Sequence, residues 1–143
     1  MFLTNNEIPV KVIVKTTIDD QETMELVVFG SYIQKGQVGY LKYEEVMEEG
    51  EVRTIVKLSE DEILILRGGA VNMRLPFQRN KRMIGHYELP FAVFETTTWV
   101  KSMEFSFENG SGLVDILYDF FLDGDHTGTY HMNITFHKRN PII

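Results

Sequence analysis

Apolar and polar residues alternate along most of this chain. The alternation is clearest in residues 8–14, 24–28, 52–58, 71–77, 114–122 and 130–136. A period of two residues is typical of β-strands that bury one face. No segment has the period of about 3.6 residues that indicates an amphipathic helix. The pattern therefore predicts an all-β protein with no helix longer than about two turns.

Turn-forming residues separate the alternating segments. Gly, Asn and Asp, which tolerate the positive φ of tight hairpins, occur at 19–20, 36, 50, 109–112 and 123–125. Strands with such short connections predict a single antiparallel meander. We expect residues 1–143 to form one domain, a closed β-barrel of about 8–10 strands, because closure removes exposed strand edges. An open β-sandwich is the alternative.

The composition narrows the classes of function. Of the 143 residues, 43% are hydrophobic and 24% are charged, which excludes collagen-like and disordered chains. The absence of cysteine excludes thiol catalysis, iron–sulfur clusters and disulfide scaffolds. A formal net charge of −7 argues against a nucleic-acid partner. Residues 1–9 lack the features of a signal peptide, and no apolar run is long enough for a membrane helix, so we expect a cytoplasmic protein.

The sequence carries no recognisable signature of catalysis or of cofactor binding. Nucleophile elbows, phosphate-binding loops and dinucleotide-binding motifs are absent. His131 and His137 lie six residues apart on one strand face, about 20 Å along it, which is too far to share an ion. Asp123, Asp125 and His126 are too few ligands for a calcium loop. We therefore expect no catalytic residue, no cofactor and no metal.

The middle of the chain resembles a known bacterial family. Residues 53–60 read Arg-Thr-Ile-Val-Lys-Leu-Ser-Glu, residues 63–77 read Ile-Leu-Ile-Leu-Arg-Gly-Gly-Ala-Val-Asn-Met-Arg-Leu-Pro-Phe, and residues 132–136 read Met-Asn-Ile-Thr-Phe. These segments look like the family of uncharacterised proteins typified by YwiB. The resemblance implies a small calycin-like, or lipocalin-like, β-barrel from a bacterium. It implies no activity and no catalytic residue.

Arg67 is the first candidate for a ligand-binding residue. If Leu58 and Ile63 face each other across the loop 59–62, the alternation points Arg67 into the barrel. A guanidinium group there needs an acceptor, because an unpaired buried charge is very costly. A ligand carboxylate or phosphate, a backbone carbonyl, or the face of Trp99 would each serve. Alternatively, Arg67 lies at the rim of the barrel.

Bulky apolar side chains share the predicted inner face with Arg67. They are Met73, Phe77, Tyr118, Phe120, Tyr130, Met132 and Phe136. In a barrel of about eight strands, such side chains either line a pocket for one small ligand or fill the interior.

Three classes of function follow in order of preference. The first is a non-enzymatic barrel that binds a small apolar or anionic amphiphilic molecule. The second is a protein-interaction module that uses the barrel exterior and the acidic hairpin at residues 44–51 to meet a basic partner. The third is an enzyme, for which the sequence offers no acid–base pair.

Overall fold

Every alternating segment forms a β-strand in the computed structural model, which describes residues 7–139. The strands are β1 (Glu7–Ile18), β2 (Glu22–Lys35), β3 (Val38–Met47), β4 (Gly50–Leu58), β5 (Ile63–Gly69), β6 (Asn72–Phe77), β7 (Arg82–Leu89), β8 (Ala92–Glu108), β9 (Ser111–Leu122) and β10 (Asp125–Lys138). The described residues contain no helix, and so none that is long and apolar enough to cross a membrane.

The strands form a closed antiparallel barrel. Each strand pairs with its neighbours along the chain, and β1 also pairs with β10, in register from Val10 opposite Lys138 to Ile18 opposite Tyr130. This pairing joins the first and last strands and excludes the open sandwich. The predicted all-β barrel is confirmed, and its ten strands lie at the upper end of the expected range.

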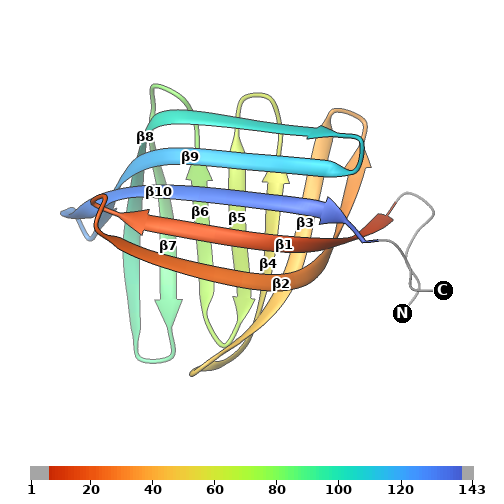
Figure 1. The fold of residues 1–143 in the computed structure, drawn as a ribbon. Helices are drawn as coiled ribbons and strands as arrows, with labels where there is room; N and C mark the ends of the chain where they lie inside the picture. Colours follow the sequence, from red (N-terminus) through yellow and green to blue (C-terminus); the bar gives the residue numbers. More distant parts are fainter. Residues whose placement is uncertain (1–6, 140–143) are drawn as a thin grey trace.

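The barrel wall consists of two groups of strands that run in different directions. In Figure 1, β1, β2, β9 and β10 run across the front of the molecule, and β4, β5, β6 and β7 run up and down behind them. The long strand β8 belongs to both groups and has a bulge between Val100 and Ser102. A bulge bends a strand and increases its twist, which helps β8 to connect the two groups.

The alternation in the sequence corresponds to the inner and outer faces of the wall. Val10 and Val12 of β1 are fully buried, whereas Lys11 between them is exposed. Leu58 and Ile63 are direct partners across the loop Ser59–Glu62, as the sequence predicts. The same register places Arg67 opposite Thr54, on the inner face of β5.

Aromatic side chains fill much of the interior. Tyr32, Phe107 and Phe136 pack together with ring centroids 4.4 to 5.8 Å apart. Gly112 lies beneath the ring of Phe136, and a Cβ atom at this position would overlap that ring. This part of the barrel is therefore closely packed, and the open space lies elsewhere.

Candidate functional site

The interior is open toward the end of the barrel that carries the β1–β2, β3–β4 and β5–β6 turns. A cavity of about 310 Å³ lies there. Its lining residues are Val14, Thr16, Met24, Glu25, Leu26, Tyr43, Glu45, Met47, Thr54, Ile65, Arg67, Met73, Leu75 and Met132. Four of the seven methionines in the chain are therefore in this one lining. Methionine is flexible and polarisable, so such a wall adapts to apolar ligands of different shape.

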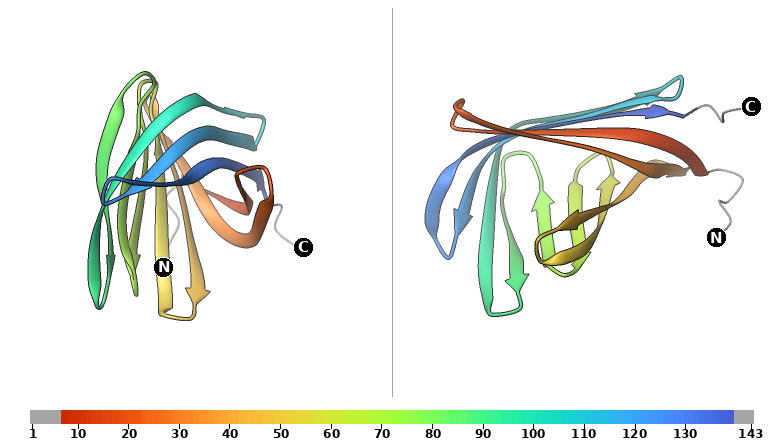
Figure 2. Two further views of the ribbon diagram at one scale, coloured as in Figure 1. Left: turned by 90° about the vertical axis from the view of Figure 1, so that its left-hand side faces the viewer. Right: turned by 60° about the horizontal axis from the view of Figure 1, so that its bottom comes forward.

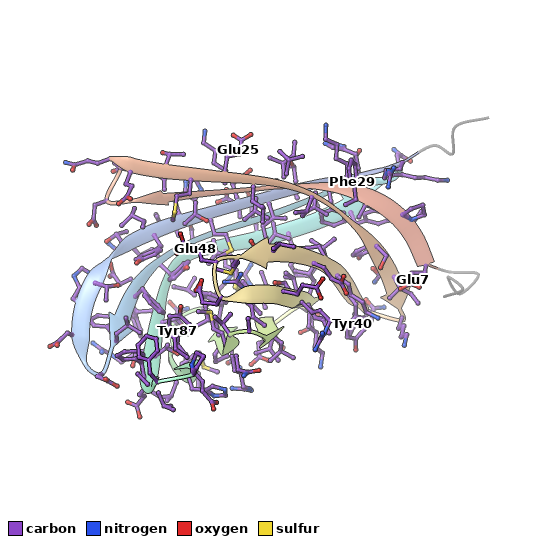
Figure 3. The ribbon with its side chains drawn as sticks, turned by 90° about the horizontal axis from the view of Figure 1, so that it is seen from below. Glu7, Glu25, Phe29, Tyr40, Glu48 and Tyr87 are labelled. Atoms are coloured by element: carbon purple, nitrogen blue, oxygen red, sulfur yellow. The ribbon has the colours of Figure 1, made fainter. Side chains whose placement is uncertain are left out.

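The cavity opens to the outside where β2 and β3 separate. These strands pair only from Gly30 opposite Tyr43 to Lys35 opposite Val38. Beyond Gly30 their hairpins diverge, as the right panel of Figure 2 shows. Figure 3 looks at this side of the barrel, with Glu25 on β2 and Glu48 at the end of the β3–β4 hairpin.

Gly30 allows the close contact from which the two strands diverge. A Cβ atom at this position would overlap the carbonyl oxygen of Lys42 and lie 3.0 Å from the Cβ atom of Tyr43. Only glycine allows the two backbones to approach this closely.

An ion pair between Arg67 and Glu45 lies in the wall of the cavity. One terminal nitrogen of Arg67 donates to a carboxylate oxygen of Glu45 and also lies 3.4 Å from the sulfur of Met47. The Arg67 side chain is 21% exposed and that of Glu45 is 16% exposed, so both groups are largely removed from water. Glu45 therefore supplies the acceptor that Arg67 needs.

Two further polar side chains lie beside this ion pair. Burial raises the pKa of Tyr43 to about 12, although the positive charge of Arg67 opposes the shift. The Tyr43 hydroxyl is therefore neutral at physiological pH. The Thr54 hydroxyl is buried beside the Tyr43 hydroxyl, whose pKa it lowers slightly, but it forms no hydrogen bond of good geometry among the described residues. A buried polar group without a well-formed hydrogen bond is costly, so Thr54 is a group that a ligand could satisfy.

The structure divides the predicted ligand-binding residues into two sets. Arg67, Met73 and Met132 line the cavity. The other four pack against one another away from the cavity lining: Phe77 contacts Tyr118, and Tyr118 and Phe120 each contact Tyr130, with ring centroids 4.8 to 5.6 Å apart. These four aromatic residues are part of the packed core rather than of the cavity wall.

Two interpretations of the sequence need correction at this site. Trp99 does not pack on Arg67, because it lies on the outer face, 37% exposed, with the guanidinium group of Arg82 over its ring. By charge, Glu45 belongs to the acidic hairpin at residues 44–51, yet its side chain faces inward and lines the cavity. The alternation Leu41, Tyr43, Glu45 already contains the signal that places Glu45 on the inner face.

A second polar cluster lies on the outer face of β9 and β10. Asp115 accepts hydrogen bonds from His131 at 2.8 Å and Asn133 at 2.9 Å. Burial alone would raise the pKa of Asp119, but hydrogen bonds from Thr129 and His126, together with the positive charge of Lys101, outweigh it and lower that pKa. Within residues 7–139, no group of three or more His, Cys, Asp or Glu side chains is placed to hold a metal ion.

His137 and Asp123 each form a contact of their own elsewhere on the barrel. His137 lies 2.9 Å from the hydroxyl of Ser111, and Asp123 accepts a hydrogen bond from the backbone nitrogen of Glu95 at 2.8 Å. These contacts tie neighbouring strands and turns together.

Comparison with known proteins agrees with the fold. The family model described as a domain of unknown function, DUF1934, matches residues 8–134. The chain belongs to the DUF1934 family. It is 34% identical over 133 residues to the uncharacterised β-barrel protein YwiB of Bacillus subtilis, and the match covers 91% of this chain and 94% of YwiB. The resemblance to the YwiB family is thus confirmed.

The crystal structure of the B. subtilis ywiB protein has the same fold as this DUF1934 domain. The two structures superpose with a TM-score of 0.86, at 34% sequence identity and over 95% of each chain. The barrel is therefore shared with a bacterial relative.

Proposed function

We propose that this DUF1934 domain binds a small, neutral amphiphilic molecule in the cavity between β2, β3 and β5, and that it does so without catalysis. The observation that carries the proposal is a cavity with a methionine-rich apolar wall and one neutralised ion pair. Lipocalin-like barrels also hold one small ligand inside the barrel.

The cavity volume and its lining favour a small ligand with an apolar body. A volume of about 310 Å³ lies at the lower end of the range for small-molecule sites. Leu26, Ile65 and Leu75 contribute aliphatic surface, and the four methionines adapt to the shape of the ligand. A chain of about eight carbon atoms is a suitable probe for a site of this size.

The ion pair favours a neutral polar group on the ligand over an anionic one. Glu45 already satisfies Arg67, so a ligand carboxylate would have to displace Glu45 and leave its charge without a partner. A hydroxyl group has no such cost, and it could hydrogen-bond to the buried Thr54 hydroxyl. This revises the expectation of an anionic ligand, because the chain itself provides the anion.

Thermal unfolding with three probes of equal chain length tests the proposal. Octanol, octanoate and octylamine differ only in the polar group. A ligand that binds only the folded state raises the unfolding midpoint by mass action. We expect octanol to raise the midpoint in a saturable manner and octanoate to have a smaller effect.

A cavity-filling variant provides the matched control. Met132→Trp places a larger side chain in the space where octanol would bind, and its own unfolding midpoint reports whether it folds. We expect this variant to lose the response to octanol. An equal response in the variant, or no response to any probe in the natural sequence, would overturn the proposal. If octanoate alone stabilises the protein and Arg67→Met abolishes that effect, the ligand is anionic and Arg67 is its anchor.

A further inference from the structure

The separation of β2 and β3 leaves two strand edges unpaired. Within the described residues, Glu22–Phe29 of β2 pair only with β1, and Glu44–Met47 of β3 pair only with β4. The free edge of β2 is eight residues long, about 26 Å in an extended strand. An unpaired edge presents a row of backbone N–H and C=O groups to which another extended chain can pair.

We propose that the free edge of β2 binds an extended peptide segment in which basic and apolar residues alternate, and that this segment adds a strand to the barrel wall beside β3. This inference goes beyond the small-molecule proposal, because it concerns the edge of the wall and a peptide partner. Strand addition of this kind obtains affinity from backbone hydrogen bonds and specificity from alternate side chains.

The inner face at the opening determines one half of the peptide pattern. Every second side chain of an added strand would point into the barrel, next to Met24 and Leu26 of β2 and Met47 of β3. These neighbours are apolar. The inward-pointing side chains of the peptide should therefore be aliphatic.

The outer face determines the other half of the pattern. The remaining side chains would point outward, next to Val27 and Phe29, which are 50% and 57% exposed, and next to Glu25 and Glu44. Lysine and arginine match this combination, because their aliphatic stems cover apolar surface while their charged ends remain in water beside a carboxylate.

The opening of the barrel is bordered by acidic side chains. Glu22, Glu25, Glu44, Glu48 and Glu49, which we call the acidic rim, border the two edges, and none of them has an ion-pair partner among the described residues. The chain also shows that a cation suits this face, because the guanidinium group of Arg139 lies over the Phe29 ring, 4.1 Å from its centroid. Charge complementarity thus selects a basic peptide.

Calorimetric titration with designed octapeptides tests the inference. The probe is a capped peptide of alternating lysine and valine. One control peptide carries glutamate in place of lysine. The other keeps lysine and valine but is methylated on alternate backbone nitrogens, which removes donors needed for strand pairing. We expect saturable one-to-one binding of the probe and binding at least ten-fold weaker for both control peptides.

Two protein variants with the same change in net charge separate the rim from general electrostatics. E22K/E44K reverses two charges of the acidic rim, at residues that do not line the cavity, whereas E104K/E108K reverses two exposed charges on the outer face of β8. We expect at least ten-fold weaker binding of the probe to the first variant and little change for the second. Equal loss in both variants, equal binding of the methylated peptide, or no binding of the probe would overturn the inference. Because the rim variant keeps the cavity lining of Met47, Met73 and Met132, its response to octanol tests the small-molecule proposal separately.

Discussion

The ion pair between Arg67 and Glu45 should contribute measurably to stability, and a double-mutant cycle can measure its contribution. The cycle compares Arg67→Met, Glu45→Leu and the double variant with the natural sequence. Each single variant leaves one charge without its partner beside the apolar wall of the cavity. The double variant leaves neither charge and replaces the pair with apolar side chains.

The exposure of the pair sets the expected magnitude. Breaking a fully buried pair costs about 3–5 kcal/mol, and an exposed pair contributes about 0–1 kcal/mol. With side chains 21% and 16% exposed, each single variant should lose about 2 kcal/mol of unfolding free energy. At about 2–4 °C per kcal/mol for larger domains, this is a decrease of about 4–8 °C in Tm.

Urea denaturation at fixed pH is the suitable assay, because it gives the free energy of unfolding for each of the four proteins. The double variant should lose no more than either single variant, about 2 kcal/mol, which gives a coupling energy of about 2 kcal/mol. A coupling energy below about 0.5 kcal/mol would show that the two side chains do not interact in the folded protein.

Three further predictions follow from burial, backbone contacts and pKa. Met73→Asp places a carboxylate in the cavity wall and should lower the free energy of unfolding by at least about 2 kcal/mol. Asn72→Asp on the outer face should change it by no more than about 0.5 kcal/mol. Equal urea midpoints for the two variants would contradict the register of β6. Gly30→Ala should lower the free energy of unfolding by about 2 kcal/mol, because the added Cβ atom would overlap the Lys42 carbonyl. At Gly68 the nearest atom to an added Cβ lies 3.8 Å away, so Gly68→Ala should change stability by less than about 0.5 kcal/mol in the same assay. Burial raises the pKa of Tyr43 from 10.0 to about 12, so the neutral Tyr43 hydroxyl contributes stability that is complete below pH 10 and is lost as the pH rises toward 12. Tyr43→Phe should reduce this alkaline loss of stability, measured by denaturation curves at increasing pH. An unchanged loss in the variant would exclude Tyr43 as its source.

The inward direction of Arg67 could be predicted because it depends only on local information. A short loop between Leu58 and Ile63 fixes their pairing, and alternation then carries the orientation along β5 to Arg67. The same logic applies to β3, where Leu41 and Tyr43 predict an inward Glu45. The acidic neighbours of Glu45 suggest a solvated hairpin, but the period of two carries the stronger structural information.

The division of the interior into a packed core and a cavity could not be predicted. Alternation shows that Met132 and Phe136 face inward, but it does not show their depth along the barrel, which depends on strand tilt and on pairing between distant strands. Phe136 packs against Tyr32, whereas Met132 lines the cavity. The separation of β2 from β3 also arises from tertiary structure, because a single strand pattern does not reveal where its partner diverges.

Methyl-labelled methionine provides the most direct test of binding in the cavity. NMR spectra of protein labelled at the methionine methyl groups would be recorded during titration with octanol. We predict that the signals of Met24, Met47, Met73 and Met132, which line the cavity, shift together and saturate, while those of Met83 and Met103, which do not line it, change little. Equal shifts of all six signals, shifts confined to Met83 and Met103, or no shift at octanol concentrations that raise the unfolding midpoint would contradict the cavity as the binding site.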